Sequence, residues 1–190
     1  RDAMRALEEK NVELAEQVKA QDGIIDDLQR VVEDQSIKLI ATQQPVAADL
    51  RTLFTTIKIV TDVERMADYA VDIARIAILL KDEEISHCIG ELRNMTEIVC
   101  VMLRDSIDAY TAKDDDRAYE ITKMDDEVDL GLMNLIKFLY YDLGHEEDSQ
   151  FKASQLNFVA KYLERIGDHA TNICEWTIYI VTGEYVELNV

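Results

Sequence analysis

The chain has 190 residues, and its 39 acidic and 20 basic side chains give a net charge of −19 at pH 7. This balance argues against a nucleic-acid-binding surface and against adhesion to anionic lipid, but it suits metal cations or a basic partner. With one proline, six glycines and long segments of helical period, the sequence predicts an all-α fold. Three widely spaced cysteines without a Cys-x-x-Cys pair indicate reduced thiols rather than a thiolate metal site or a disulfide framework.

Apolar residues at helical spacing predict six helices in chain order. The chain opens inside helical sequence over Arg1–Glu9, so we expect the first helix to be truncated at its start. A break near Lys10 separates it from the second helix, and Pro45 is expected in the first turn of the third. Gly183 fits a helix stop. The five longer helices are expected at residues 12–42, 46–80, 85–112, 116–143 and 149–181.

One long helix occurs twice, one hundred residues apart. The later copy is FVAKYLERIGDHATNICEWTIYIVTG over Phe158–Gly183, and the earlier copy is IVTDVERMADYAVDIARIAILL over Ile59–Leu80. In each copy apolar residues advance by four, three and four positions, which keeps one apolar face against neighbouring helices. Met66 and Ile166 lie in the middle of this face and are expected in the core. Beside the face runs a polar stripe, which is Glu164, Asp168, Asn172 and Glu175 in the later copy and Glu64, Asp68, Asp72 and Arg75 in the earlier one.

The helix before each long copy is repeated as well. Asp22 and Asp26 in QDGIIDDL recur as Asp125 and Asp129 in MDDEVDLG, 103 residues later. A repeated helix pair implies a repeated supersecondary unit. We therefore expect two tandem three-helix bundles, the first over residues 1–82 and the second over residues 83–190.

Four acidic pairs at i, i+4 spacing fall at equivalent places in the two repeats. The chain has eight such pairs and its composition predicts about eight by chance, so only the repeated positions are informative. Each pair presents two carboxylates on one helix face, and two pairs on neighbouring helices would gather four oxygen-bearing groups. Such a set suits a divalent or trivalent cation, and the alternative is a solvated acidic face without a bound ion. The pairs are Asp22/Asp26 with Glu64/Asp68, and Asp125/Asp129 with Glu164/Asp168.

No catalytic motif can be read from the sequence. His87 and His145 lie in or near expected loops, and no Glu-x-x-His occurs at a repeated position, as a ferritin-like di-iron centre would require. His169 follows Asp168 and points to the rim of the same stripe at most. We therefore expect a protein that is not an enzyme. A carboxylate-bridged metalloenzyme, in which two ions activate water, remains an alternative.

Three motifs resemble the PhoU family, the phosphate-uptake regulators associated with bacterial phosphate transporters. They are QQPVAADLR over Gln43–Arg51, the ERMAD and ERIGD cores of the long helices, and the ending NICEW-x-x-x-IVTGE. The resemblance extends from about Leu14 to Glu184. It implies two three-helix bundles in a cytoplasmic protein that works beside the membrane through its partners.

The resemblance also implies multinuclear clusters of Fe, Zn, Mn or Mg, held by E(D)xxxD motifs. In this sequence the motifs are Asp22/Asp26, Glu64/Asp68, Asp125/Asp129 and Glu164/Asp168, with Asp72, Asn172 and Glu175 as flanking ligands. Gln21 and Arg75 depart from a fully acidic surround, so the first cluster is expected to hold fewer ions.

The implied function is regulatory. The protein would act as an adaptor between a phosphate ABC transporter and a sensor histidine kinase, and would hold the kinase inactive when phosphate is plentiful. An accessory domain of another ion transporter is an alternative that the sequence does not separate from this one. Apolar residues on three helices of a flat bundle leave room for self-association, and we expect a homodimer.

Overall fold

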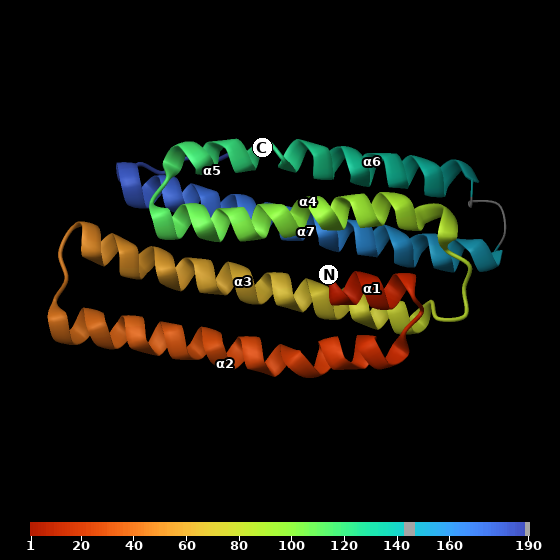
Figure 1. The fold of residues 1–190 in the computed structure, drawn as a ribbon, viewed down its shortest axis with the longest axis horizontal. Helices are drawn as coiled ribbons and strands as arrows, with labels where there is room; N and C mark the ends of the chain where they lie inside the picture. Colours follow the sequence, from red (N-terminus) through yellow and green to blue (C-terminus); the bar gives the residue numbers. More distant parts are fainter. Residues whose placement is uncertain (143–146, 189–190) are drawn as a thin grey trace.

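The computed structural model describes residues 1–142 and 147–188 of the chain. Seven helices and no strand lie within these residues, which confirms the all-α prediction. The helices are α1 (Asp2–Glu8), α2 (Val12–Gln43), α3 (Ala48–Leu79), α4 (Ser86–Ala112), α5 (Asp115–Thr122), α6 (Asp125–Asp142) and α7 (Glu147–Thr182) (Figure 1).

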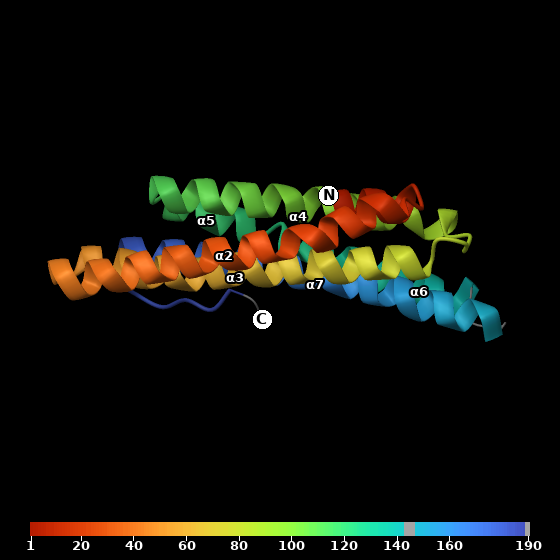
Figure 2. The same ribbon diagram turned by 90° about the horizontal axis from the view of Figure 1, so that it is seen from below.

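The helices form two groups that meet along α3 and α7. The first group is α1, α2 and α3, and the second is α4, α5 with α6, and α7. In the described residues α2, α3, α7 and α6 lie side by side in one layer, while α1 and α4 pack across that layer (Figure 2). The two repeated long helices therefore run antiparallel at the centre of the molecule.

The connection between α2 and α3 corrects the prediction for Pro45. Gln44 ends α2 in the left-handed region, with a φ of 49°, and its N–H donates to the Ile40 carbonyl at 3.3 Å. The residue before a proline is disfavoured in the right-handed helical region, so α2 cannot continue through Gln44. Because α3 begins only at Ala48, Pro45 lies in the loop and not in the first helical turn. Gly183 ends α7 with a φ of 81°, as expected.

The fifth predicted helix, over residues 116–143, is two helices in the structure, and residue 143 lies outside the described residues. α5 ends at Thr122 and α6 begins at Asp125. Short-range hydrogen bonds close the turn, from Met124 N to Ile121 O at 3.0 Å and from Glu127 N to Met124 O at 3.1 Å. Three consecutive acids at residues 125–127 favour a new helix start, since carboxylates interact with the free N–H groups of a first turn.

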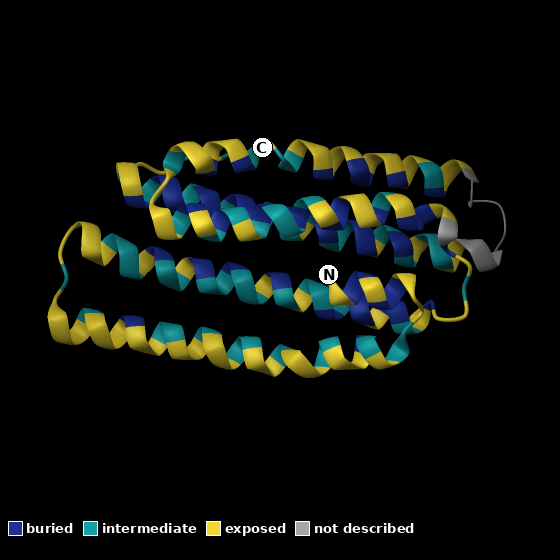
Figure 3. Cartoon of the chain, viewed as in Figure 1, coloured by how far each residue is buried: buried dark blue, intermediate teal, exposed yellow. Residues whose placement is uncertain are grey.

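The apolar faces predicted for the two long helices line the core (Figure 3). Met66, Ile73 and Leu163 are buried, as expected for the middle of the repeat. Ile166 is only half-buried, so that prediction was wrong. It lines an apolar cavity of about 280 Å³ beside the first turn of α1, and this unfilled space leaves one side of Ile166 uncovered.

The contact between α3 and α7 has the symmetry of the repeat. His169 Nδ1 lies 2.8 Å from Asp62 Oδ1, and the Tyr69 ring stacks on the Tyr162 ring with 5.6 Å between centroids. Position 62 matches 162 in the repeat, and 69 matches 169, so each contact is the other with the helices exchanged. Such reciprocal contacts are typical of elements related by a two-fold axis.

Candidate metal centres

On the first bundle the predicted set is Asp22 and Asp26 of α2 with Glu64 and Asp68 of α3. Burial raises the pKa of Glu64, and the charges of Asp68, Asp26 and Asp22 raise it further. Burial also raises the pKa of Asp68, followed by the charges of Asp22, Asp26 and Asp72. The carboxylates of α2 and α3 therefore influence each other's ionisation. That these four residues form one metal site stays a prediction.

The second bundle holds the equivalent set, Asp125 and Asp129 from α6 with Glu164 and Asp168 from α7. Burial, and then the charges of Asp168, Asp129 and Glu164, raise the pKa of Asp125 to about 7. The pKa of Asp129 is raised by burial and by the charge of Asp168. Burial differs between matching positions, because Asp168 is half-buried where Asp68 is exposed, whereas Asp129 is exposed where Asp26 is half-buried.

Gly167 makes room for the Asp125 carboxylate. A Cβ atom at residue 167 would lie 2.6 Å from Asp125 Oδ1, which is closer than real Cβ contacts. The first repeat has Ala67 at the matching position, in ERMAD instead of ERIGD. The glycine therefore lets a carboxylate of α6 approach the backbone of α7, and this close approach contributes to the burial that raises the pKa of Asp125.

The donor atoms of the second set fit a bound cation. Among the described residues, Asp125 Oδ1 and Glu164 Oε2 are buried carboxylate oxygens without a hydrogen-bond partner. Lys161 donates to Glu164 Oε1, and Arg165 Nη1 donates to Asp168 Oδ2 at 2.9 Å. Arg165 Nε lies 3.7 Å from Glu164 Oε2, so this oxygen has an ion-pair contact but no hydrogen bond. Buried acceptors without a hydrogen bond cost free energy, and a cation would offset that cost. An all-oxygen set suits Mg or Mn, and also Fe or Zn with carboxylate ligands.

The carboxylates of the two sets do not form a coordination sphere around one point. In residues 1–142 and 147–188, no group of three His, Cys, Asp or Glu side chains stands close enough to hold one ion. Lys161 and Arg165 engage Glu164 and Asp168 in ion pairs, so an ion would have to displace these contacts. In the first bundle Arg75 Nη1 donates to Asp72 at 2.6 Å and occupies that flanking carboxylate in the same way.

Two of the predicted flanking ligands make other contacts. Asn172 Nδ2 donates to Asp62 Oδ1 at 3.2 Å, within the contact between α3 and α7. Glu175 Oε1 accepts a hydrogen bond from the Leu188 N–H at 2.7 Å and so fixes the segment after α7. Both side chains therefore have structural partners that a sequence pattern does not show.

Asp62 is the residue that sequence reasoning missed. It is buried in the contact between the bundles, where it pairs with the equally buried His169. The ring of Tyr69 stacks on His169 with 5.9 Å between centroids. His169 thus points into the contact between the bundles and not to the rim of the acidic set. The available signal was the repeat itself, which places positions 62 and 169 opposite each other once α3 and α7 are antiparallel.

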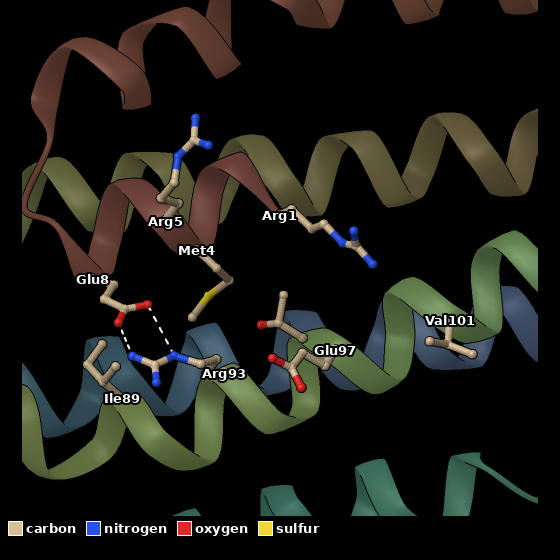
Figure 4. Close-up of a pocket in the computed structure, with 9 residues that line it drawn as sticks. Arg1, Met4, Arg5, Glu8, Ile89, Arg93, Glu97 and Val101 are labelled. Carbon is tan, nitrogen blue, oxygen red and sulfur yellow. Dashed lines mark hydrogen bonds and ion pairs between the residues drawn. The ribbon is translucent and has the colours of Figure 1, made fainter.

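A separate hollow of about 490 Å³ lies between α1 and α4, and none of the candidate metal ligands lines it (Figure 4). Arg93 of α4 makes two hydrogen bonds to the Glu8 carboxylate of α1 there, which ties one bundle to the other. Arg5 points away from this pair and lies 3.3 Å from Asp2. Arg5 and Arg93 are thus engaged in ion pairs at the edge of the hollow.

The relatives of the chain agree with this architecture. The model of the PhoU domain matches residues 1–77 and 92–177. The chain belongs to the PhoU domain family. The phosphate-specific transport system accessory protein PhoU homolog of Clostridium acetobutylicum is 46% identical over 189 residues, which are 99% of this chain and 86% of that protein. The homolog of Zymomonas mobilis is 38% identical over 95% of this chain and 76% of its own length.

Solved PhoU structures share the fold. The crystal structure of PhoU from Pseudomonas aeruginosa has a TM-score of 0.91 and 33% identity, and the match covers 96% of this chain and 88% of that one. The phosphate transport system regulatory protein PhoU from Streptococcus pneumoniae has a TM-score of 0.89 and 28% identity, over 98% and 87% of the two chains. The family resemblance inferred from three motifs is therefore confirmed. None of the helices in the described residues is long and apolar enough to cross a bilayer.

Proposed function

We propose that this PhoU-family protein regulates phosphate uptake as an accessory protein of a phosphate transport system. The observation that carries the proposal is the 46% identity, along 99% of the chain, to a protein named for that role. The relatives are named as accessory or regulatory proteins, which supports a role without catalysis. In this role the protein acts in the cytoplasm as an adaptor between a phosphate ABC transporter and a sensor histidine kinase.

The shape and charge of the molecule suit an adaptor. α1 and α4 cover one side of the layer of long helices, and the other side offers a broad face to a partner (Figure 2). A net charge of −19 attracts basic surfaces and speeds their encounter. When phosphate is plentiful, the adaptor would hold the kinase in its inactive state.

The proposed function includes metal at both acidic sets. Asp22, Asp26, Glu64 and Asp68 would hold ions on the first bundle, and Asp125, Asp129, Glu164 and Asp168 on the second. The bound cation would supply the positive charge that lets four neighbouring carboxylates stay ionised. The residues of this chain would contribute oxygen ligands, while Lys161 and Arg165 would move away from the carboxylates that they now neutralise.

Complementation tests the regulatory role. A bacterium that lacks its own PhoU homolog and carries a phosphate-starvation reporter would express this chain, with the Clostridium acetobutylicum homolog as positive control. We expect the reporter to be repressed again at high phosphate. Capture of the transporter's ATPase subunit and of the kinase by the tagged chain would then test the adaptor role. The proposal fails if the positive control represses the reporter and this chain does not, or if only the subunits of another ion transporter are captured.

Elemental analysis tests the metal sites. The protein would be purified without chelator, and its metal content compared with that of a Glu164→Ala, Asp168→Ala variant. We expect bound Fe, Zn, Mn or Mg in the first sample and a partial loss in the second, since the first bundle is intact. A metal-free protein that also fails to bind added ions would return both sets to solvated acidic faces.

A further inference from the structure

The segment after α7 folds back onto the helix that it leaves. Gly183 has a φ of 81°, which L side chains rarely adopt, and a Cβ atom there would collide with Nη1 of Arg51 in α3. The glycine therefore permits a sharp turn close to α3. Residues 184–188 then run along the side of the layer that faces away from α1 and α4 (Figure 2). We name residues 184–188 the C-terminal strap.

The side chains of the C-terminal strap alternate between the inside and the outside. Val186 and Leu188 are half-buried and pack against the core, whereas Tyr185 and Glu187 are exposed. A period of two is that of an extended chain laid on a surface. The strap contains no helical turn, so it sits on the bundle as an extended segment.

α7 provides the surface beneath the C-terminal strap. Glu175 Oε1 accepts a hydrogen bond from the Leu188 N–H at 2.7 Å, and the Tyr179 ring stacks on the Tyr185 ring with 4.2 Å between centroids. Trp176 meets Tyr185 edge to face at 6.0 Å, and it meets an aromatic ring of α3 in the same way at 5.9 Å. We name this set the strap seat: Phe54 of α3 with Glu175, Trp176 and Tyr179 of α7.

The internal repeat shows that the fold does not require the aromatic rings of the strap seat. With the shift of 100 residues, Trp176 and Tyr179 match Ile76 and Leu79 of α3. Ile76 is buried, and Leu79 is 57% exposed at the end of its helix. Tryptophan and tyrosine are enriched at the centres of protein interfaces. The strap seat therefore has the composition of a binding surface, which the first bundle lacks at the matching place.

Few contacts hold the C-terminal strap in place. Fixing the backbone of an extended segment costs conformational entropy, and the half-buried Val186 and Leu188 offset only part of that cost. Tyr185 stays 66% exposed although it stacks on α7. Segments with few buried contacts open at a low free energy while the rest of the protein stays folded. The strap can therefore leave and uncover the strap seat.

We propose that the strap seat is a docking site for an extended segment of a partner protein, and that the C-terminal strap is its autoinhibitory occupant. The strap shows which segment fits, since it offers apolar side chains at alternate positions and a backbone N–H to Glu175. Arg51 and Lys58 border the seat in a molecule of net charge −19. Acidic residues beside the apolar ones suit these cations, as Glu184 and Glu187 do in the strap.

Binding of a labelled peptide to the full chain tests the proposal. The peptide has the sequence of residues 183–188 with an amidated end, and fluorescence anisotropy measures its affinity. Val186→Ser with Leu188→Ser removes the inward side chains of the strap, and Glu187→Ser is the matched control on its outward side. We expect the double variant to bind the peptide at least about tenfold more tightly than the wild type or the control, because the strap no longer competes.

Trp176 reports the same opening without a label, since it is the one tryptophan of the chain. Acrylamide should quench its fluorescence more strongly in the double variant than in the wild type, and added unlabelled peptide should restore the protection. Adding Glu175→Ala to the double variant should weaken peptide binding. Glu175→Gln should preserve it, because an amide oxygen accepts the same N–H. These measurements need neither metal nor transporter, so their result is independent of the proposed regulatory function.

Four results would overturn the assignment. Equal peptide affinity and equal quenching in the wild type and the double variant would mean that the strap does not close the seat. A double variant that does not bind the peptide at about 1 mM, the effective concentration of a tethered segment, would exclude the docking site. Unchanged affinity in Glu175→Ala would place the peptide elsewhere. Quenching of the wild type that varies with protein concentration would assign the seat to the strap of a second copy. If the double variant loses helical content, Leu188→Ser alone answers the same question.

Discussion

Asp125→Asn should stabilise the metal-free protein at pH 8. The folded state raises the pKa of Asp125 from 3.8 to about 7. Between these two values the unfolded chain releases its proton first, so stability falls as pH rises through this window and stays low above it. The full shift corresponds to about 4 kcal/mol, and partial solvent screening reduces this to about 1–2 kcal/mol. For a chain of this size the melting temperature should rise by roughly 3–6 °C.

Thermal unfolding followed by circular dichroism, with a chelator present, measures this effect. At pH 5 the stability gain from Asp125→Asn should be smaller by about half. This pH lies between the pKa of Asp125 in the unfolded and in the folded chain, so only part of the destabilisation of the wild type has developed. Asp126→Asn is the matched control, since it removes an exposed charge from the same helical turn. An Asp125→Asn protein that melts at or below the wild type at pH 8, or a control that gains as much, would refute the reasoning. With Mn or Mg added the order should reverse, because the variant has lost a ligand.

Three further changes test the same structure. Chelation should lower the melting temperature of the wild type. Glu164→Ala with Asp168→Ala should remove the part of that response that the second bundle contributes, and an unchanged response would mean that these residues do not bind the metal. Met66→Asp puts a charge in the core and should cost several kcal/mol in urea unfolding, and an unchanged midpoint would contradict its burial. Gly167→Ala should displace the Asp125 carboxylate, cost about 1–3 kcal/mol and weaken metal-dependent stabilisation; wild-type values in both assays would mean that the contact is not close.

Periodicity predicted the helices because burial of a long apolar face outweighs the conformational preference of any single residue. Periodicity gave the wrong helix boundaries where short-range interactions compete with the apolar pattern. The break after Lys123 depends on a tight turn and on charge at a helix start, which a continuous apolar pattern does not report. The half-buried state of Ile166 depends on how completely α1 fills the space above it. A periodic pattern gives the side of a helix that faces inward, but not how well its neighbours cover it.

The acidic sets were predictable because duplication filters out chance pairs. Equivalent positions in two repeats lie on equivalent faces, so the repeat predicts one set of four carboxylates on two adjacent helices in each bundle. The neutralising contacts of Lys161 and Arg165 depend on side-chain rotamers and could not be predicted. The pair of Asp62 and His169 depends on how the bundles pack against each other, which no pattern within one helix encodes.

The reciprocal contact between α3 and α7 has a consequence for how the chain can vary. Two separate copies of one bundle, meeting across a true two-fold axis, would have to place the same residue pair on both sides of the axis. The covalent link removes that restriction, so a substitution can change one side alone. The present chain has Asp62 with His169 on one side and Tyr69 with Tyr162 on the other. Fusion has thus given the contact between α3 and α7 one polar pair and one aromatic pair.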